Sequence, residues 1–277
     1  MQKDPSIRYS ILDPTGNITA LVEGMPDVEK RPEIASELMR RHPEVEQVGF
    51  VRSAAPGAPV RAELCMAGGE FCGNASMCAA ALTLLREGAA DADETVLLRV
   101  SGASAPVTVR LCPEGANAFR TEVRMPPALS IGETELRFGA LCAVLPLIRM
   151  EGISHLIVEP SSPFFALLSD RAAAEQAVRD FCDALVADGL GMLFLEQGGP
   201  ALCMTPLVYI PGSGTVFWEN SCASGSSAVG MLLAARSGVR TELELSEPGG
   251  TLHVKSDPAS GETWLCGSVR LTAQSSL

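Results

Sequence analysis

The stretch CGNASMCAAALTLLREG, residues Cys72–Gly88, recurs later in the chain as CASGSSAVGMLLAARSG, residues Cys222–Gly238, and the two align without a gap. Each stretch begins with small residues after its cysteine, continues with helix-forming residues and ends in a glycine that suits a helix C-cap. Both are therefore predicted to be helices with a cysteine at the N-terminal edge. The repeat divides the chain into two related halves, and the expected fold follows from this division.

Similar segments flank the two predicted helices in the same order. GNITALVE, residues 16–23, and GISHLIVE, residues 152–159, precede the helices, and each joins a glycine to an apolar strand-like run and a closing glutamate. Two segments with alternating apolar residues around a glycine turn, residues 95–111 and 241–256, follow the helices. Each half thus reads as strands, one principal helix and further strands. We expect an α/β (α+β) fold with two pseudo-symmetric domains.

The repeat also sets the expected domain boundaries. The first domain should span residues 1–130 and carry Cys72, and the second should span residues 131–263 and carry Cys222. The segment MPPALSIGETELRFG, residues 125–139, is the expected connection between the halves.

One further helix is predicted in each half. DRAAAEQAVRDFCDALVADG, residues 170–189, has apolar residues at three- and four-residue spacings, with Gly189 as the expected terminator. Residues 25–43 match this pattern loosely and also precede the cysteine of their half.

The composition favours a folded, soluble protein. The chain has 277 residues, 47% of them hydrophobic, and a formal net charge of -12. Because nucleic-acid binding needs clustered Lys and Arg to contact phosphates, nucleic acid is excluded as an expected partner. No apolar run approaches the roughly 18 residues of a membrane span, and the N-terminus lacks the apolar core of a signal peptide. We therefore expect a cytoplasmic protein without a membrane partner.

Residue counts argue against two kinds of cofactor. The only lysines are Lys3, Lys30 and Lys255, none near a motif, whereas pyridoxal phosphate enzymes need a Schiff-base lysine. The nine cysteines show no structural-zinc spacing, so no metal site is expected. Because the chain is large and has no secretion signal, most cysteines should be reduced and buried.

The matched positions of Cys72 and Cys222 indicate acid–base chemistry. A helix N-terminus carries unpaired N–H groups and a partial positive charge, so it favours a thiolate and binds a carboxylate. Two such sites related by pseudo-symmetry can remove a proton from one face of a carbon and deliver a proton to the other, which inverts a stereocentre. A cysteine hydrolase would leave the second cysteine unexplained.

Five short motifs in order give the chain a resemblance to a known family. They are DPTGN ending at Asn17, CGNA at Cys72–Ala75, GISH ending at His155, SCASGS at Ser221–Ser226 and EPGG at Glu247–Gly250. At these residues the chain resembles the diaminopimelate epimerase family of cofactor-independent amino acid racemases and epimerases. The resemblance covers nearly the whole chain.

This resemblance implies two similar domains, each a β-barrel around a central α-helix, with the active site between them. It implies that the last strand, about residues 264–277, returns to the first domain, and that no cofactor is used. The implied catalytic residues are Cys72, Cys222, Glu219 and His155. The implied substrate-binding residues are Asn17, Gly73, Asn74, Ala223, Ser224 and Gly225.

Simpler roles stay open for several of these residues. His155 lies in an apolar run, where a hydrogen-bonded core histidine is common. Glu219 could cap the following helix, and Asn17 and Asn74 could serve left-handed turns beside glycine.

Departures from the family pattern bear on the substrate, which is expected to be a free amino acid. The segment TPLVYIPGSGTVFWENSC before the second cysteine has no arginine to bind a distal carboxylate, and Ile153 stands where diaminopimelate enzymes have asparagine. The segments GGEFCGNA and ENSC resemble the histidine racemase type more than the diaminopimelate enzymes, so histidine is the expected substrate. Diaminopimelate epimerisation and a non-catalytic amino-acid-binding relic of the fold are the alternatives, and a homodimer stays open.

Overall fold

The computed structural model describes residues 7–198 and 201–277, and the chain divides into two compact units. Unit 1 contains the chain up to Val123 together with Cys266–Leu277, and unit 2 contains Arg124–Leu265. None of the helices in the described part of the chain is long and apolar enough to cross a membrane.

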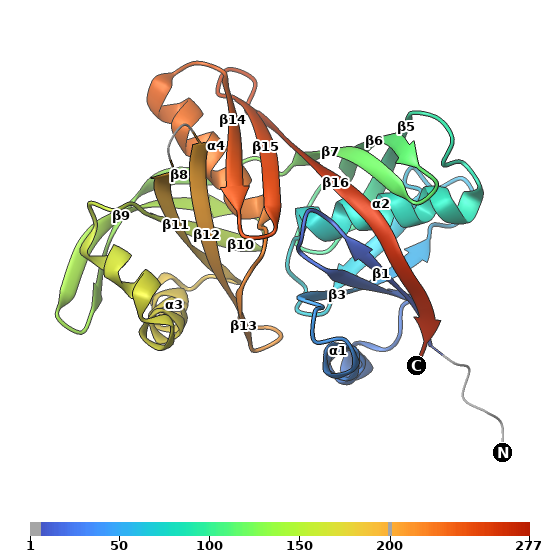
Figure 1. The fold of residues 1–277 in the computed structure, drawn as a ribbon, viewed down its shortest axis with the longest axis horizontal. Helices are drawn as coiled ribbons and strands as arrows, with labels where there is room; N and C mark the ends of the chain where they lie inside the picture. Colours follow the sequence, from blue (N-terminus) through green and yellow to red (C-terminus); the bar gives the residue numbers. More distant parts are fainter. Residues whose placement is uncertain (1–6, 199–200) are drawn as a thin grey trace. The chain divides into compact units, whose positions relative to one another are not determined.

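Unit 1 is a barrel of strands around the helix α2 (Gly73–Glu87). The strands pair in chain order, and β1 also pairs with the last strand, so that the sheet closes on itself (Figure 1). These strands are β1 (Arg8–Asp13), β2 (Thr19–Glu23), β3 (Gln47–Ser53), β4 (Ala62–Met66), β5 (Glu94–Val100), β6 (Val107–Gly115), β7 (Ala118–Met125) and the later part of β16 (Glu262–Ser276).

Unit 2 is built on the same plan around the helix α4 (Ala223–Ser237). Its strands follow the order β8-β9-β10-β11-β12-β14-β15-β16, with β13 paired to β12. The strands are β8 (Ser130–Phe138), β9 (Leu141–Met150), β10 (Ile153–Val158), β11 (Leu190–Gly198), β12 (Ala201–Ile210), β13 (Thr215–Trp218), β14 (Thr241–Glu247), β15 (Gly250–Asp257) and the start of β16.

The strand directions repeat between the two units. In unit 1, β2 runs parallel to β3 and β4 runs parallel to β5; in unit 2, β10 runs parallel to β11 and β12 runs parallel to β14. Parallel neighbours need a crossover connection, and a helix lies in each one. The crossover helices are α1 (Arg31–Arg41, after the 3₁₀ turn η1, Val28–Lys30), α2, α3 (Arg171–Leu185, after η2, Pro163–Ser169) and α4. The predicted fold class is confirmed.

The two central helices form as the repeat predicts. α2 is buried from Gly73 to Leu84, and α4 is buried over nearly all of its first twelve residues. A helix that is apolar and small on every side can be enclosed in this way, because it leaves few polar groups without a partner. Gly88 and Gly238 end the helices in the left-handed conformation, with φ of 65° and 71°.

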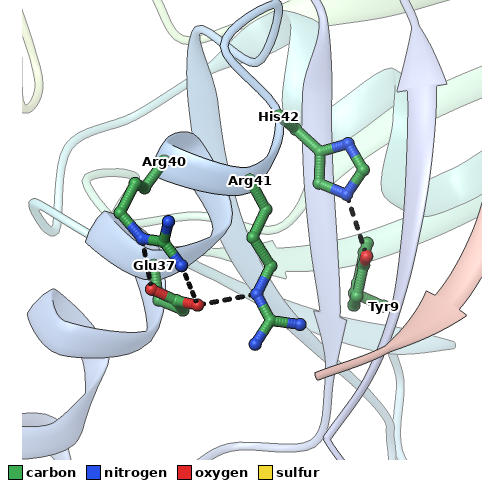
Figure 2. Close-up of polar contacts among 5 residues, drawn as sticks. All are labelled: Tyr9, Glu37, Arg40, Arg41 and His42. Carbon is green, nitrogen blue, oxygen red and sulfur yellow. Dashed lines mark hydrogen bonds and ion pairs between the residues drawn. The ribbon is translucent and has the colours of Figure 1, made fainter.

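The outer helix α1 is attached to β1 near its C-terminal end. The Tyr9 hydroxyl on β1 and Nε2 of His42, the C-cap residue of α1, form a hydrogen bond of 2.9 Å. Figure 2 shows this contact beside the exposed carboxylate of Glu37, which accepts hydrogen bonds from Arg40 and Arg41 on the same helix. These contacts fix the helix end that leads into β3.

Two local expectations are wrong. α3 ends at Leu185, before the expected terminator Gly189, because Val186 adopts the left-handed conformation with φ of 50° and its N–H bonds to the last turn. The segment 125–139 is mostly the strand β8, which pairs antiparallel with β9 and buries Leu136. Only residues 126–129 lie between β7 and β8, so adjacent prolines marked a short link rather than a long connection.

Candidate active site

The sulfur of Cys222 lies at the N-terminus of α4. Cys222 is the N-cap residue, has extended backbone angles, and is 4% exposed. Its Sγ accepts a hydrogen bond of 3.4 Å from the N–H of Gly225. A Cβ at position 225 would lie 3.2 Å from this sulfur and 2.8 Å from Leu193 Cδ2, so a glycine there allows the close approach. The cap places the sulfur at the N-terminus of the helix, where the helix dipole favours a negative charge.

Two buried carboxyl groups oppose that effect. Glu247 Oε2 accepts the backbone N–H of Cys222 at 2.7 Å, and its Oε1 accepts the hydroxyl of Ser226 at 2.5 Å. Burial raises the pKa of Glu247 to about 8 despite these donors. Burial, followed by the charges of Glu219 and Glu247, raises the pKa of the Cys222 thiol well above its ordinary value. Burial and these carboxyl groups therefore favour the protonated thiol of Cys222.

Ser224 connects Cys222 to a buried histidine. His155 Nε2 and Ser224 Oγ lie 3.0 Å apart, and Ser224 Oγ lies 3.6 Å from Cys222 Sγ. His155 projects from β10 and is fully buried, and burial lowers its pKa to about 3. The imidazole is therefore neutral at physiological pH and does not supply a positive charge to the thiol.

Cys72 has the same place at the N-terminus of α2, with different neighbours. It is the N-cap residue, and its Sγ accepts a hydrogen bond of 3.2 Å from the N–H of Ala75. The thiol donates to Oε1 of Gln47, the first residue of β3, at 2.6 Å. A neutral amide thus contacts this sulfur, whereas carboxyl groups face Cys222.

Asparagine side chains link the start of α2 to the turn before β2. Asn74 Nδ2 donates to Asn17 Oδ1 at 3.2 Å, and Asn17 Nδ2 donates to Glu46 Oε2 at 2.7 Å. Both asparagines are buried. Neither has positive φ, since Thr15 and Val186 are the only non-glycine residues with positive φ in the described chain, so the left-handed-turn role is wrong for both.

The structure places the predicted site residues in two groups, one in each unit. Cys72, Gly73, Asn74 and Asn17 gather at the start of α2. Cys222, Ala223, Ser224 and Gly225 form the start of α4, with His155 and Glu219 beside them. Glu219 does not cap α4, because Cys222 is the N-cap.

Sequence reasoning missed three residues that contact these groups. Gln47 opens a strand without a motif, Glu247 belongs to the EPGG turn, and Gly191 lies in no motif. The repeat gave no signal for Gln47, because the equivalent position in unit 2 is Gly191. In the described ranges 7–198 and 201–277, no three His, Cys, Asp or Glu side chains are grouped so as to hold a metal ion.

Two solved structures with the same fold are described as a proline racemase and a hydroxyproline epimerase. A probable proline racemase from Agrobacterium radiobacter, with bound carbonate, superposes with a TM-score of 0.71 at 14% identity, covering 98% of this chain and 92% of that one. A hydroxyproline epimerase from Agrobacterium vitis, with bound trans-4-hydroxy-L-proline, also gives 0.71 at 12% identity, covering 100% and 92%. At such identities the likeness shows the fold alone.

Two sequence relatives share more identity with this chain than these structures do. A histidine racemase from Fusobacterium nucleatum is 28% identical over 232 residues, which is 80% of this chain and 78% of the relative. A histidine racemase from Staphylococcus aureus is 30% identical over 252 residues, which is 90% of this chain and 88% of the relative. The family described as "Histidine racemase CntK N-terminal domain" matches residues 6–276. The chain belongs to this family.

Proposed function

We propose that this protein racemises free histidine, without pyridoxal phosphate, by a two-base mechanism in which Cys72 and Cys222 are the acid–base pair. Family membership makes the chain an isomerase of the amino acid racemase and epimerase class. The observation that supports the two-base proposal best is the matched capping of α2 and α4 by the two cysteines.

In the proposed reaction one sulfur is a thiolate and the other a thiol. The thiolate takes the α-proton from one face of the substrate, and the thiol gives its own proton to the opposite face. The C–H bond that breaks and the C–H bond that forms share the same α-carbon, so the product is the mirror image and the two sulfurs exchange protonation states. The reverse reaction uses each sulfur in the opposite role.

The proposed role of the helix N-termini is electrostatic. Charge moves from the α-carbon into the substrate carboxylate as the proton leaves, and backbone N–H groups at a helix start stabilise such an oxyanion. The amides of Gly73, Asn74, Ala223 and Ser224 belong to the first turns of α2 and α4. We assign them to the carboxylate, with Asn17 contacting the substrate beside Asn74.

Histidine is proposed as the substrate on two grounds. The two sequence relatives described above are named as histidine racemases. The segment before Cys222 also offers no arginine for a second substrate carboxylate, which would need a charge partner if buried. This second ground disfavours diaminopimelate, the alternative substrate.

The test is α-deuteration of each L-amino acid in D₂O, followed by chiral chromatography of the products. We expect deuterium incorporation and the D-enantiomer from L-histidine in untreated protein and in protein dialysed against chelator. Activity that appears only after adding pyridoxal phosphate, or efficient turnover of LL-diaminopimelate with none of histidine, would overturn the proposal. Tight binding of histidine with neither exchange nor inversion would identify a binding relic.

A further inference from the structure

In each unit a side chain from a pair of parallel strands lies near the cysteine, but the two units use different strands of the equivalent pair. Unit 1 uses the second strand, β3, and unit 2 uses the first strand, β10. Thr19 on β2 pairs with Gln47 on β3, and in the repeat alignment Thr19 corresponds to His155. His155 on β10 pairs with Gly191 on β11 in the same parallel register. In unit 1 the first strand of the pair carries a small side chain, Thr19, and the second carries a long one, Gln47. In unit 2 the first strand carries the long side chain of His155, and the second carries Gly191, which has no side chain.

Gly191 is the reason that the His155 ring has room. A Cβ built on Gly191 would lie 2.3 Å from His155 Nδ1 and 2.8 Å from its Cε1. Separations below 3.0 Å between such atoms cannot be accommodated without a shift. The ring is buried on every side, so any side chain at position 191 would displace it from Ser224.

The contacts of His155 also settle its tautomer. The neutral ring carries one N–H, and within the described residues Nδ1 has no hydrogen-bond partner while Nε2 faces Ser224 Oγ. An orphaned buried donor is rarer in proteins than an under-used acceptor, so the proton belongs on Nε2. Ser224 Oγ then accepts from His155, and its own hydrogen is available to Cys222 Sγ at 3.6 Å.

We infer that His155 is a positioning residue that holds the Ser224 hydroxyl as a hydrogen-bond donor to Cys222 Sγ, and that Gly191 is the residue that makes this arrangement possible. Gln47 is the counterpart in unit 1, where one side chain contacts the cysteine directly. The inference deepens the proposed function, since it assigns His155 a role through Ser224 rather than as a proton-transfer group.

A hydrogen-bond donor at Ser224 opposes the effect of the carboxyl groups around Cys222. Glu219 precedes the helix and Glu247 faces it from β14, and each of the two carboxyl groups disfavours the thiolate when it is ionised. On β15, which packs against α4, the buried side chains are those of Leu252, Val254 and Ser256, none of which is charged. The Ser224 hydroxyl is the contact that lowers the pKa of Cys222 against these carboxylates.

The first test is a double-mutant cycle between positions 155 and 191, in which the stability of each variant is measured by thermal unfolding. Gly191→Ala should lower the Tm by at least about 5 °C in the otherwise unchanged chain and by less than about 2 °C when His155 is Ala. Equal losses in the two backgrounds would overturn the contact. If Gly191→Ala alone does not fold, folding of the His155→Ala, Gly191→Ala chain supports the contact, and failure of both contradicts it.

The second test measures Cys222 itself and needs no activity. In a Cys72→Ser chain, the modification of Cys222 by methyl methanethiosulfonate is followed from pH 6 to 11 by mass spectrometry. Ser224→Ala and His155→Asn should lower the rate at pH 8 roughly tenfold, with an unchanged limiting rate at high pH. His155→Gln keeps a donor near the Nε2 position and should restore the rate to within about threefold.

The outcomes separate this inference from the proposed function. A profile that does not move in Ser224→Ala, or a His155→Gln profile shifted as far as that of His155→Asn, overturns the positioning role whether or not the protein racemises histidine. The expected shifts in a protein that does not racemise any amino acid would instead support the positioning role and contradict the proposed function.

Discussion

Cys72 and Cys222 are N-caps of two buried helices, and each sulfur accepts a hydrogen bond from the amide three residues later in the chain. Their surroundings differ, because an amide contacts the first and carboxyl groups face the second. Equivalent backbone positions therefore hold two thiols in different surroundings. In the proposed two-base mechanism one sulfur is charged while the other is protonated, and the two exchange these states in the reverse reaction.

Replacing either cysteine by alanine should stop racemisation. Each change removes the base for one enantiomer and the acid for the other, so we expect a loss of at least roughly 10²-fold to 10⁴-fold in both directions. Serine can still donate a proton but is a far weaker base, so slow chemistry from one enantiomer is expected. Chiral assays of both directions, with circular dichroism to confirm folding, measure this.

Cys142→Ser is the matched control, because that thiol is exposed and lies on β9, outside both predicted groups. It should keep wild-type racemisation. Near wild-type activity in Cys72→Ala or Cys222→Ala would show that the two-base mechanism is wrong.

Gln47→Glu tests the neutral contact to Cys72 at nearly constant shape. A carboxylate in place of the amide would face the sulfur and raise the pKa of the thiol. Modification of Cys72 near pH 7, followed in a Cys222→Ser chain, should slow by about tenfold or more. Gln47→Met, which fills the space without charge, should slow it less; an equal effect of both changes would mean that packing alone matters.

Glu247→Gln should change how stability depends on pH. The pKa of Glu247 is about 8 in the folded protein against 4.5 as its ordinary value, so the folded state holds a proton that the unfolded state has lost. Its contribution is complete below pH 4.5 and is lost as the pH rises through 8. The wild type should lose up to ~1.4 kcal/mol per pH unit over this window relative to the variant. Urea unfolding at several pH values measures the difference, and parallel curves would contradict it.

Gly102→Ala should disturb the loop that leads into Cys72. Gly102 has φ of 70°, and a Cβ there would lie 2.2 Å from the backbone N of Phe71, the residue before Cys72. Gly88→Ala is a matched control with φ of 65° and open space around the Cβ. The control should cost about 1 kcal/mol of unfolding free energy from backbone strain, and Gly102→Ala clearly more. Equal costs would show that the loop adjusts freely.

The parts of the fold that sequence could predict are those written in periodic patterns. The central helices follow from runs of small residues with a glycine at the end, and the hairpins β5–β6 and β14–β15 follow from alternation around a turn. The end of α3 was missed because Val186 takes a backbone conformation that its residue type disfavours.

The sequence predicts the candidate site only where residues with a reactive side chain occupy matched positions of the repeat. The cysteines lie at matched positions of the repeat, so sequence comparison finds them. Gln47 and Gly191 cannot be predicted from the sequence, because their importance depends on which strand of a parallel pair supplies the long side chain. That choice differs between the units and leaves no periodic trace.

The strand β16 also has a consequence for biosynthesis. Its first residues belong to unit 2, whereas from Cys266 onward it belongs to unit 1 and pairs with β1. Because the whole of unit 2 lies between β1 and this partner strand in the chain, the ribosome makes β1 well before the strand that pairs with it. Until β16 has been made, the nascent β1 carries an unpaired edge, which is the kind of edge that chaperones shield.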